Sequence, residues 1–262
     1  MKRIKLIAQN YGEAFGADRA IRDLIARKMV SGVSVMAASE LWPREAMPLV
    51  DLLPKAGGRI EVGMMICLSK PFKPVSHAAR EKFPEGFPSV AAIRMRNRMS
   101  RGFRRLLAAE IAAQLDQFER HFFRPPDFLD GWQDVHETTA VRQALMHMIE
   151  RMERPMPSWI RAARPGKLLD RWRQARLGKL GIRTSPDTMS IPAGLDEEKL
   201  SKFFFSAVER LPDETVLTVR PSEYDERVRR NDRRYKEREW AYRFMTSPDF
   251  ERVLNRKEIY LF

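Results

Sequence analysis

The stretch IKLIAQNYGEAFGADRAIRDLIARKMVSGVSVMA, residues 4–37, decides the fold. It opens on a short apolar run, Ile4 to Ala8, and closes on a second β-prone run, Gly32 to Ala37. Between the two, apolar residues recur at helical spacing from Asp18 to Met29, and Asp18 is a candidate N-cap. A strand that leads into a helix and then into another strand is typical of a parallel βα unit.

The same alternation continues along the chain, with further short β-prone runs separated by helical patterns. These runs are Arg59 to Ile66, Phe128 to Asp130, Trp159 to Arg161, Val216 to Val219 and Ile259 to Phe262. The pattern predicts an α/β protein, a single irregular (β/α) barrel of about seven or eight mostly parallel strands. Barrels of this kind reach about 250 residues around one core, so we expect residues 1–262 to form one domain. Their functional face lies at the carboxyl ends of the strands.

Three longer segments complete the predicted organisation. The helical pattern from about Ser89 to Phe118 ends before the pair Pro125 and Pro126. Residues 69–88 contain four prolines and little periodicity, so they predict a long loop. Residues 223–257 are densely charged and predict an exposed helical region.

Composition excludes several classes of protein. With 44% hydrophobic residues, the chain has enough apolar side chains for a large core, which argues against a disordered protein, and its 32% charged residues argue against a membrane protein. No apolar stretch approaches the roughly 20 residues of a membrane span. The lone cysteine, Cys67, cannot form an internal disulfide, and the start of the chain lacks a signal-peptide pattern. We therefore expect a cytoplasmic protein, and a homodimer stays open.

The chain is strongly basic, with a net charge of +13 and a sequence pI near 10.2. Its arginines gather in two helical-looking stretches: Arg94, Arg96, Arg98, Arg101, Arg104 and Arg105, then Arg227, Arg229, Arg230, Arg233 and Arg234. Such clusters usually form solvated helix faces with buried stems. They also allow an anionic partner, which includes nucleic acid.

The predicted strand ends present a polar but ligand-poor set of side chains. The set comprises Gln9, Asn10, Tyr11, Met65, Cys67, Asp130, Trp132, Asp134, His136, Arg161 and Arg220. A metal hydrolase needs about three histidine or carboxylate ligands around an open position. Only Asp130, Asp134 and His136 offer that chemistry, and no further ligand comes from another strand, so we predict no metal. Cys67 lies within an apolar run and is expected to be a buried small hydrophobe rather than a nucleophile.

These residues resemble those of the YdjC-like carbohydrate deacetylases, which include diacetylchitobiose deacetylases and hopanoid-associated branches, over nearly the whole chain. The first strand of that family ends in Asn-Ala-Asp-Asp-Phe-Gly, where this chain has Ile7-Ala8-Gln9-Asn10-Tyr11-Gly12. The family's third strand is similar to Val-Gly-Leu-His-Leu-Thr-Leu, and here Met65 takes the place of the metal-binding histidine. Relative to the family, Gln9 and Asn10 replace two aspartates, and Met65 replaces one histidine.

The resemblance continues through a second family motif, Pro-x-x-x-Asp-Gly/Ser-His-Gln-His-Val-His, which is similar to the segment from Pro126 to His136. Trp132 stands at a metal histidine, and His136 alone is retained among three histidines. The family's His-Pro-Gly resembles Arg220-Pro221-Ser222, so an arginine replaces the histidine that assists proton transfer. Arg161 matches a basic position of the family. The family uses a divalent metal, but its ligands are not retained in this sequence.

Three hypotheses about function follow. The first is a catalytically degenerate or repurposed member, a pseudoenzyme that binds a sugar or acetylated amino-sugar-bearing ligand through the cleft residues just named, with Trp132 as a stacking platform. The second is a working deacetylase that uses a different pair of groups, Asp134 and His136. The third is a basic interaction or nucleic-acid-binding protein that uses the arginine clusters and predicts a steep salt dependence.

Overall fold

The computed structural model describes residues 2–57, 60–95, 101–151, 157–162, 177–179, 181–185, 188–190, 197–256 and 258–261. Contacts between Cα atoms divide the chain into two compact units. Unit 1 consists of Met1–Val35, Pro43–Val62 and Ser185–Phe262, and unit 2 of Met36–Trp42 and Gly63–Thr184. Every strand pairing in the described part of either unit is parallel.

The sheet of unit 1 is built around β1 (Lys2–Tyr11). Its parallel neighbours are β2 (Gly32–Val35) and β8 (Thr215–Val219), while β9 (Ile259–Leu261) pairs with its first residues. The short β7 (Thr188–Ser190) adds to the outer side of β8. β1 is buried almost continuously from Ile4 onward, which is typical of a central parallel strand that is covered on both faces.

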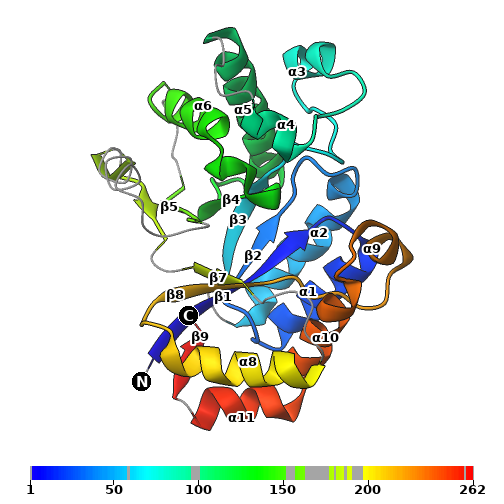
Figure 1. Cartoon of the computed structure of the whole chain (residues 1–262), viewed down its shortest axis with the longest axis vertical. Helices are drawn as coiled ribbons and strands as arrows, with labels where there is room; N and C mark the ends of the chain where they lie inside the picture. The colour runs from blue at the N-terminus through cyan, green and yellow to red at the C-terminus, as the bar shows by residue number, and fades with distance from the viewer. Residues whose placement is uncertain are drawn as a thin grey trace. The chain divides into compact units, whose positions relative to one another are not determined.

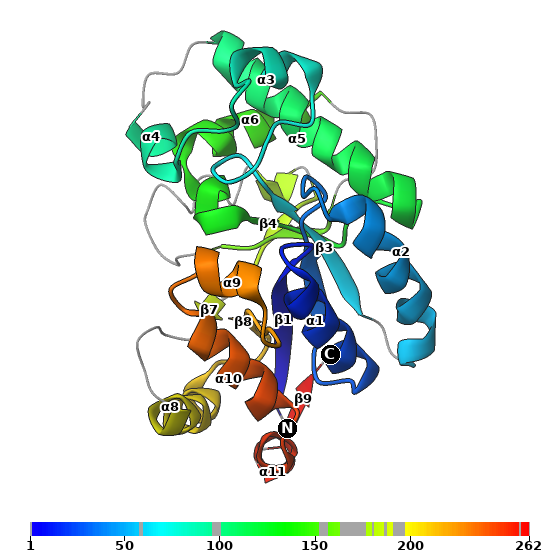
Figure 2. The same cartoon turned by 90° about the vertical axis from the view of Figure 1, so that its right-hand side faces the viewer.

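Helices cover this sheet in unit 1 (Figures 1 and 2). They are α1 (Phe15–Ala26), α2 (Trp42–Leu52), the short 3-10 helix η1 (Leu53–Ala56), α8 (Glu197–Arg210), α9 (Glu226–Asn231), α10 (Tyr235–Met245) and α11 (Pro248–Arg256). Figure 2 shows α1 and α10 side by side, where the Tyr242 hydroxyl donates to Asp23 over 3.0 Å. Phe204, Phe244 and Phe250 join α8, α10 and α11 through ring contacts of 5.3–5.7 Å between centroids.

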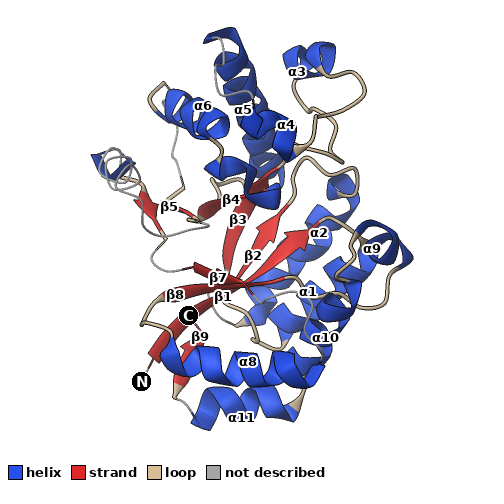
Figure 3. Cartoon of the chain, viewed as in Figure 1, coloured by secondary structure: helices blue, strands red, loops and turns tan. Residues whose placement is uncertain are grey.

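Unit 2 carries a second run of parallel strands, coloured red in Figure 3. They are β3 (Glu61–Ile66, from Gly63 onward), β4 (Phe128–Gly131), β5 (Trp159–Ile160) and β6 (Arg183–Thr184). Its helices are α3 (His77–Lys82), α4 (Val90–Met95), α5 (Arg101–Phe122), the 3-10 segment η2 (Trp132–Glu137) and α6 (Thr139–Ile149). Gly63 is required here, because a Cβ atom at that position would lie 2.3 Å from the ring of Phe128.

The seven strands predicted from sequence are all found, although Arg59 and Phe262 lie outside the described residues. The first helix prediction was wrong at its start: α1 begins at Phe15, and Asp18 lies inside the first turn. Asp18 instead turns back, and its Oδ1 accepts a 2.6 Å hydrogen bond from the Gly12 amide. Gly12 has φ 97°, so the chain reverses at that residue and the helix starts early.

The predictions of long segments need two corrections. The loop at 69–88 contains α3, because the Ser76 hydroxyl accepts from the Ala79 amide and caps the helix. Buried Glu110 of α5 adds to this by accepting hydrogen bonds from the Val75 and Ser76 amides at 2.9 and 2.8 Å. The helix expected from Ser89 to Phe118 is described as α4 and α5, with residues 96–100 outside the described ranges.

The charged region 223–257 forms α9, α10 and α11, with residue 257 outside the described ranges. It is less exposed than its composition indicates, since Trp240 and Phe244 of α10 are buried. The expectation of one domain over residues 1–262 stays a prediction. In the described part of the chain, no helix is both long and apolar enough to cross a membrane.

Candidate functional site

The polar residues at the end of β1 belong to unit 1, and each is already engaged within it. The side-chain oxygen of Gln9 accepts a long hydrogen bond of 3.4 Å from Nε of Arg220. Asn10 adopts a left-handed conformation with φ 73°, and its Nδ2 donates to Glu13 over 3.0 Å. An asparagine tolerates this conformation better than most residues, so the amide suits the sharp turn after the strand.

Tyr11 is fully buried rather than open to a cleft. Its hydroxyl donates to the Glu45 carbonyl at 2.7 Å and accepts from Arg22 at 2.7 Å. Burial raises the pKa of the Tyr11 hydroxyl far above its usual value, and the nearby Arg22 guanidinium only partly offsets this. Tyr11 therefore stays protonated and ties the end of β1 to α1 and α2.

A polar pocket of about 60 Å³ lies where the carboxyl ends of β1, β7 and β8 meet α10 in unit 1. It is lined by Gln9, Ser190, Thr218, Val219, Arg220, Asp232, Arg234, Glu237, Arg238 and Ala241. The hydroxyls of Ser190 and Thr218 lie 2.8 Å apart. Hydroxyl, amide, carboxylate and guanidinium groups are thus collected at the strand ends, the edge on which parallel α/β folds place their ligands.

Arg238 is a buried cation in the lining of this pocket, and it was not among the site residues predicted from sequence. Although 3% exposed, it forms ion pairs with Glu13 at 2.8 Å and Asp232 at 3.2 Å. Burial lowers the pKa of Arg238, but the two carboxylates outweigh burial and hold the pKa above its ordinary value. Since Asn10 also donates to Glu13, a chain of contacts runs from the strand end into α10. Only the tertiary fold joins Glu13 to Arg238, because these two residues lie far apart in sequence.

In unit 2, Arg161 organises the end of β4. Its Nε donates to Asp130 Oδ1 over 2.6 Å, and its second terminal nitrogen donates to Asp134 in a very short contact. Asp130 is fully buried, and its Oδ1 also accepts from the Gly131 amide at 2.7 Å. Burial raises the pKa of Asp130, but the Arg161 guanidinium outweighs it and lowers the pKa below the ordinary value. Both groups are therefore charged at neutral pH.

His136 is buried beside this pair, and one of its nitrogens is engaged. Nε2 lies 2.8 Å from the carbonyl of Arg161, which fixes Nε2 as the N–H donor. Nδ1 has no hydrogen-bond partner within the described part of the chain and faces Gly131, where an added Cβ would lie only 2.2 Å away. Burial and the neighbouring Arg161 charge both lower the pKa of His136, so it is neutral.

Trp132 and Met65 lie together in an apolar cluster of unit 2. Buried Met36, Met65 and Cys67 form the centre of this cluster, and half-buried Trp132 and Phe72 pack against it. The Trp132 and Phe72 rings meet edge to face at 5.5 Å, and the indole N–H donates to the Lys70 carbonyl at 3.0 Å. Cys67 is buried, as a small hydrophobic residue would be.

Comparison with known families identifies this architecture. The model of the YdjC-like protein family matches residues 3–256. The chain belongs to the YdjC-like family. No curated protein matches its sequence. Among solved structures, a protein from Enterococcus faecalis V583 proposed to cleave cellobiose phosphate is 15% identical, with a TM-score of 0.75. That match covers 100% of this chain and 97% of the other, and it confirms the predicted α/β fold of the irregular (β/α) barrel type.

Two more distant structural matches to this YdjC-like chain are carbohydrate-active enzymes. A family 4 carbohydrate esterase from Streptomyces lividans is 10% identical with a TM-score of 0.46, covering 99% of this chain and 91% of that one. A polysaccharide deacetylase from Bacillus cereus is 8% identical with a TM-score of 0.47, covering 99% and 90%. Both likenesses are too remote to add to the argument from the family.

The residues at the family's metal positions do not fit a divalent ion. The resemblance places metal histidines at Met65 and Trp132, and in the structure these two side chains pack in one apolar cluster. Thioether and indole groups are poor ligands for zinc or magnesium. Among the residues the structure describes, no group of three or more His, Cys, Asp or Glu is arranged to hold a metal.

The site residues predicted from sequence thus fall into two groups. Gln9, Asn10, Tyr11 and Arg220 lie in unit 1, and the pocket joins Gln9 to Arg220. Met65, Asp130, Trp132, Asp134, His136 and Arg161 lie in unit 2, where Arg161 joins Asp130, Asp134 and His136. That both groups line a common cleft stays a prediction.

Proposed function

We propose that this YdjC-like protein binds a sugar or a sugar-bearing ligand, such as an N-acetylated amino sugar, and has lost metal-dependent deacetylation. One observation carries the proposal. Met65 and Trp132, which stand at the family's metal histidines, pack together against Met36 and Cys67. An apolar cluster takes the place where the family's chemistry requires imidazoles, while a polar pocket lies at the ends of β1, β7 and β8.

The chemical cost of these replacements is large. A bound metal lowers the pKa of water from far above neutral to about 7, so its loss removes the hydroxide nucleophile at neutral pH. Arg220 stands where the family has the histidine that assists proton transfer, and it cannot be deprotonated to act as a base. Loss of a general base lowers the rate by a further factor of about 10² to 10⁴. Together the two losses leave no efficient route to amide hydrolysis.

The groups that remain are suited to binding a sugar. Trp132 is half-buried and has an aromatic surface on which a sugar ring can stack. Considered by itself, the pocket of unit 1 offers the amide of Gln9, the hydroxyl of Thr218 and the guanidinium of Arg220 as hydrogen-bonding groups. The related structure from Enterococcus faecalis is named for a phosphorylated disaccharide, which is consistent with a carbohydrate ligand here.

Two alternatives have less support. A hydrolase that uses Asp134 and His136 would need an accessible imidazole, but His136 is 2% exposed and donates to the Arg161 carbonyl. A nucleic-acid surface at Arg227 to Arg234 would need open cations, and there Arg230 and Arg233 are exposed but Arg229 is engaged. Within this stretch Arg229 pairs with Glu239, and its guanidinium lies over the rings of Tyr224 and Tyr235. Both alternatives predict outcomes of the experiment below.

The test measures binding and hydrolysis on the same sample. Diacetylchitobiose is titrated into the protein by calorimetry, and acetate release is followed with and without added zinc. We expect saturable binding and no acetate release in either condition. Trp132→Leu should weaken binding by about 1 kcal/mol through loss of ring contact. Phe123→Leu, which changes a 90% exposed aromatic residue, is the matched control and should bind as the wild type does.

Acetate release at a rate that responds to Asp134→Asn would support the hydrolase and contradict the proposal. Absence of saturable binding across a panel of N-acetylated and unmodified oligosaccharides would contradict it as well. Salt-sensitive binding of DNA without any sugar binding would favour the basic interaction protein.

A further inference from the structure

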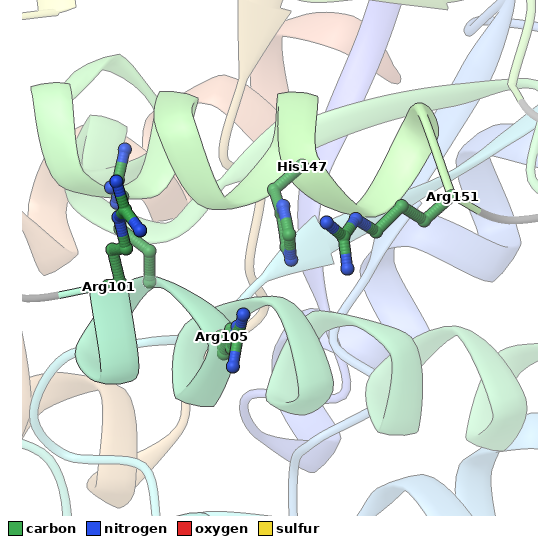
Figure 4. Close-up of a pocket in the computed structure, with 5 residues that line it drawn as sticks. Arg101, Arg105, His147 and Arg151 are labelled. Atoms are coloured by element: carbon green, nitrogen blue, oxygen red, sulfur yellow. The ribbon is translucent and has the colours of Figure 1, made fainter.

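A second pocket lies between α5 and α6 in unit 2, and its lining consists of cationic residues and a histidine. Its volume is about 250 Å³, and it is lined by Arg101, Arg104, Arg105, His147 and Arg151. Figure 4 shows Arg101 and Arg105 rising from α5 while His147 reaches down from α6 towards Arg105. Arg151, which follows α6, directs its guanidinium towards His147.

The arrangement on α5 concentrates positive charge on one face. Arg101, Arg104 and Arg105 are spaced i, i+3 and i+4, so their side chains project from the same side of the helix. Like charges at this spacing destabilise a helix. Arg151 and His147 then close the pocket from α6, which brings four formal positive charges to one small cavity.

These charges lack carboxylate partners in the described part of the chain. Among the described residues, the side chains of the pocket's arginines make one hydrogen bond, from Arg104 to the neutral side-chain oxygen of Gln143, and at 3.5 Å it is long. Elsewhere in the molecule, the buried or half-buried arginines Arg22, Arg161 and Arg238 all contact carboxylates within 3.2 Å. Arg101, Arg105 and Arg151 are exposed, so water solvates their charges in the free protein, and among the described residues no carboxylate competes with an anion for this pocket.

We propose that this pocket binds the phosphate group of a small phosphorylated ligand. Guanidinium groups match the oxygens of a phosphate with paired, charge-assisted hydrogen bonds, and several of them around one cavity favour a compact dianion. A volume of about 250 Å³ is below the range of drug-sized ligands, so it suits a phosphate with a few attached atoms. A nucleic acid would instead require an extended basic groove along several elements.

This site is separate in its residues from the proposed sugar site, so each can fail without the other. The experiment titrates glucose 6-phosphate, glucose, inorganic phosphate and inorganic sulfate into the full chain at fixed ionic strength. We expect glucose 6-phosphate and inorganic phosphate to bind and glucose to leave this pocket empty. Chemical shifts of the histidine ring protons should report contact at His147.

Two variants with the same change in net charge decide between a built site and general attraction. Arg105→Gln/Arg151→Gln removes one guanidinium from each side of the pocket and should weaken phosphate binding about tenfold or more. Arg230→Gln/Arg233→Gln removes two exposed arginines of unit 1 and should leave it unchanged. Thermal unfolding of both variants shows that they are folded.

Equal weakening in both variants would mean that the affinity comes from the net charge of +13, and the proposal would be wrong. It would also be wrong if wild-type protein binds neither phosphate nor glucose 6-phosphate at millimolar concentration. Binding of a short single-stranded DNA that is lost in the pocket variant, with no binding of free phosphate, would replace the proposal with a nucleic-acid site. Sulfate binding as tight as phosphate would show that the pocket recognises any compact oxyanion and not a phosphorylated ligand.

Discussion

Arg161 holds Asp130 in a buried ion pair, with the guanidinium Nε 2.6 Å from the carboxylate Oδ1. Their side chains are 5% and 0% exposed, so neither charge is compensated by water. Asp130 lies in β4, and Arg161 follows β5 and donates its own amide to the Leu129 carbonyl at 2.9 Å. The pair therefore fixes the adjacent ends of β4 and β5. Trp132 and Asp134 follow directly after β4.

Asp130→Asn should destabilise the protein by about 3 kcal/mol, because removing one partner leaves a buried charge without full compensation. Urea unfolding at pH 7 measures the effect. Asp213→Asn is the matched control: it breaks a pair with Arg3 whose side chains are 53% and 50% exposed, and such pairs contribute less than about 1 kcal/mol. The Arg161 contact lowers the pKa of Asp130, so the difference from wild type should shrink as pH falls below about 4. Equal losses in both variants would contradict this account.

Gly131→Ala should be destabilising by about 1–3 kcal/mol, because the new Cβ would lie 2.2 Å from Nδ1 of His136. The cause is the approach of the histidine ring, since Gly131 itself has an extended conformation with φ −149°. Gly178→Ala provides the control, as nothing lies within 4 Å of its added Cβ. The midpoint of thermal unfolding should fall for Gly131→Ala and should not fall for Gly178→Ala. His136→Ala should relieve part of the loss caused by Gly131→Ala.

Much of the fold follows from sequence, and the exceptions have physical reasons. Long, nearly continuous apolar runs such as Ile4 to Ala8 mark strands buried on both faces. β6 and β7 were missed because their few residues are mostly polar, whereas the equally short β5 has the apolar pair Trp159 and Ile160. The helix α3 was hidden within a proline-rich segment because its start is held by the carboxylate of Glu110, which lies far along the chain in α5.

The candidate site was predicted only in part. Strand ends could be assigned from sequence, which located Gln9, Asp130 and Arg220. The contact of Arg238 with Glu13 could not be predicted, because it joins distant segments that only the folded chain brings together. The cluster of Met65 with Trp132 likewise depends on β3 and β4 being neighbours.

Asp18 should make stability fall as pH rises. Burial raises the pKa of its carboxyl to about 8, only partly offset by the hydrogen bond from the Gly12 amide. A carboxyl whose pKa is raised on folding favours the unfolded state between its unfolded pKa, about 3.9, and its folded pKa. Asp18→Asn keeps an acceptor for Gly12 and removes the ionisation, so it should be more stable than wild type at pH 8 by at least about 1 kcal/mol.

Urea unfolding from pH 5 to pH 9 tests this dependence. The wild type should lose stability across the range, whereas Asp18→Asn should lose less. The exposed Asp51→Asn in α2 serves as a control and should follow the wild type. Parallel curves for wild type and Asp18→Asn would show that Asp18 is ionised in the folded protein.

Restoring the family's chemistry should require several substitutions at once: Gln9→Asp, Asn10→Asp, Met65→His and Trp132→His, with Arg220→His. Met65→His alone places an imidazole in an apolar cluster without further ligands, so it should cost about 1–3 kcal/mol of stability and bind no zinc. The combined variant supplies carboxylates and imidazoles together, and ligands that act as a unit give an effect only when all are present. Zinc content after dialysis and acetate release from diacetylchitobiose measure the result.

The matched control carries Met36→His in place of Met65→His, which adds the same group to the same cluster at a position outside the family's motif. We expect zinc and activity in the combined variant, and neither in the control or in any single variant. Stoichiometric zinc in the unmodified protein would contradict the loss of the metal site, and an inert, zinc-free combined variant would show that the frame around these positions has diverged as well.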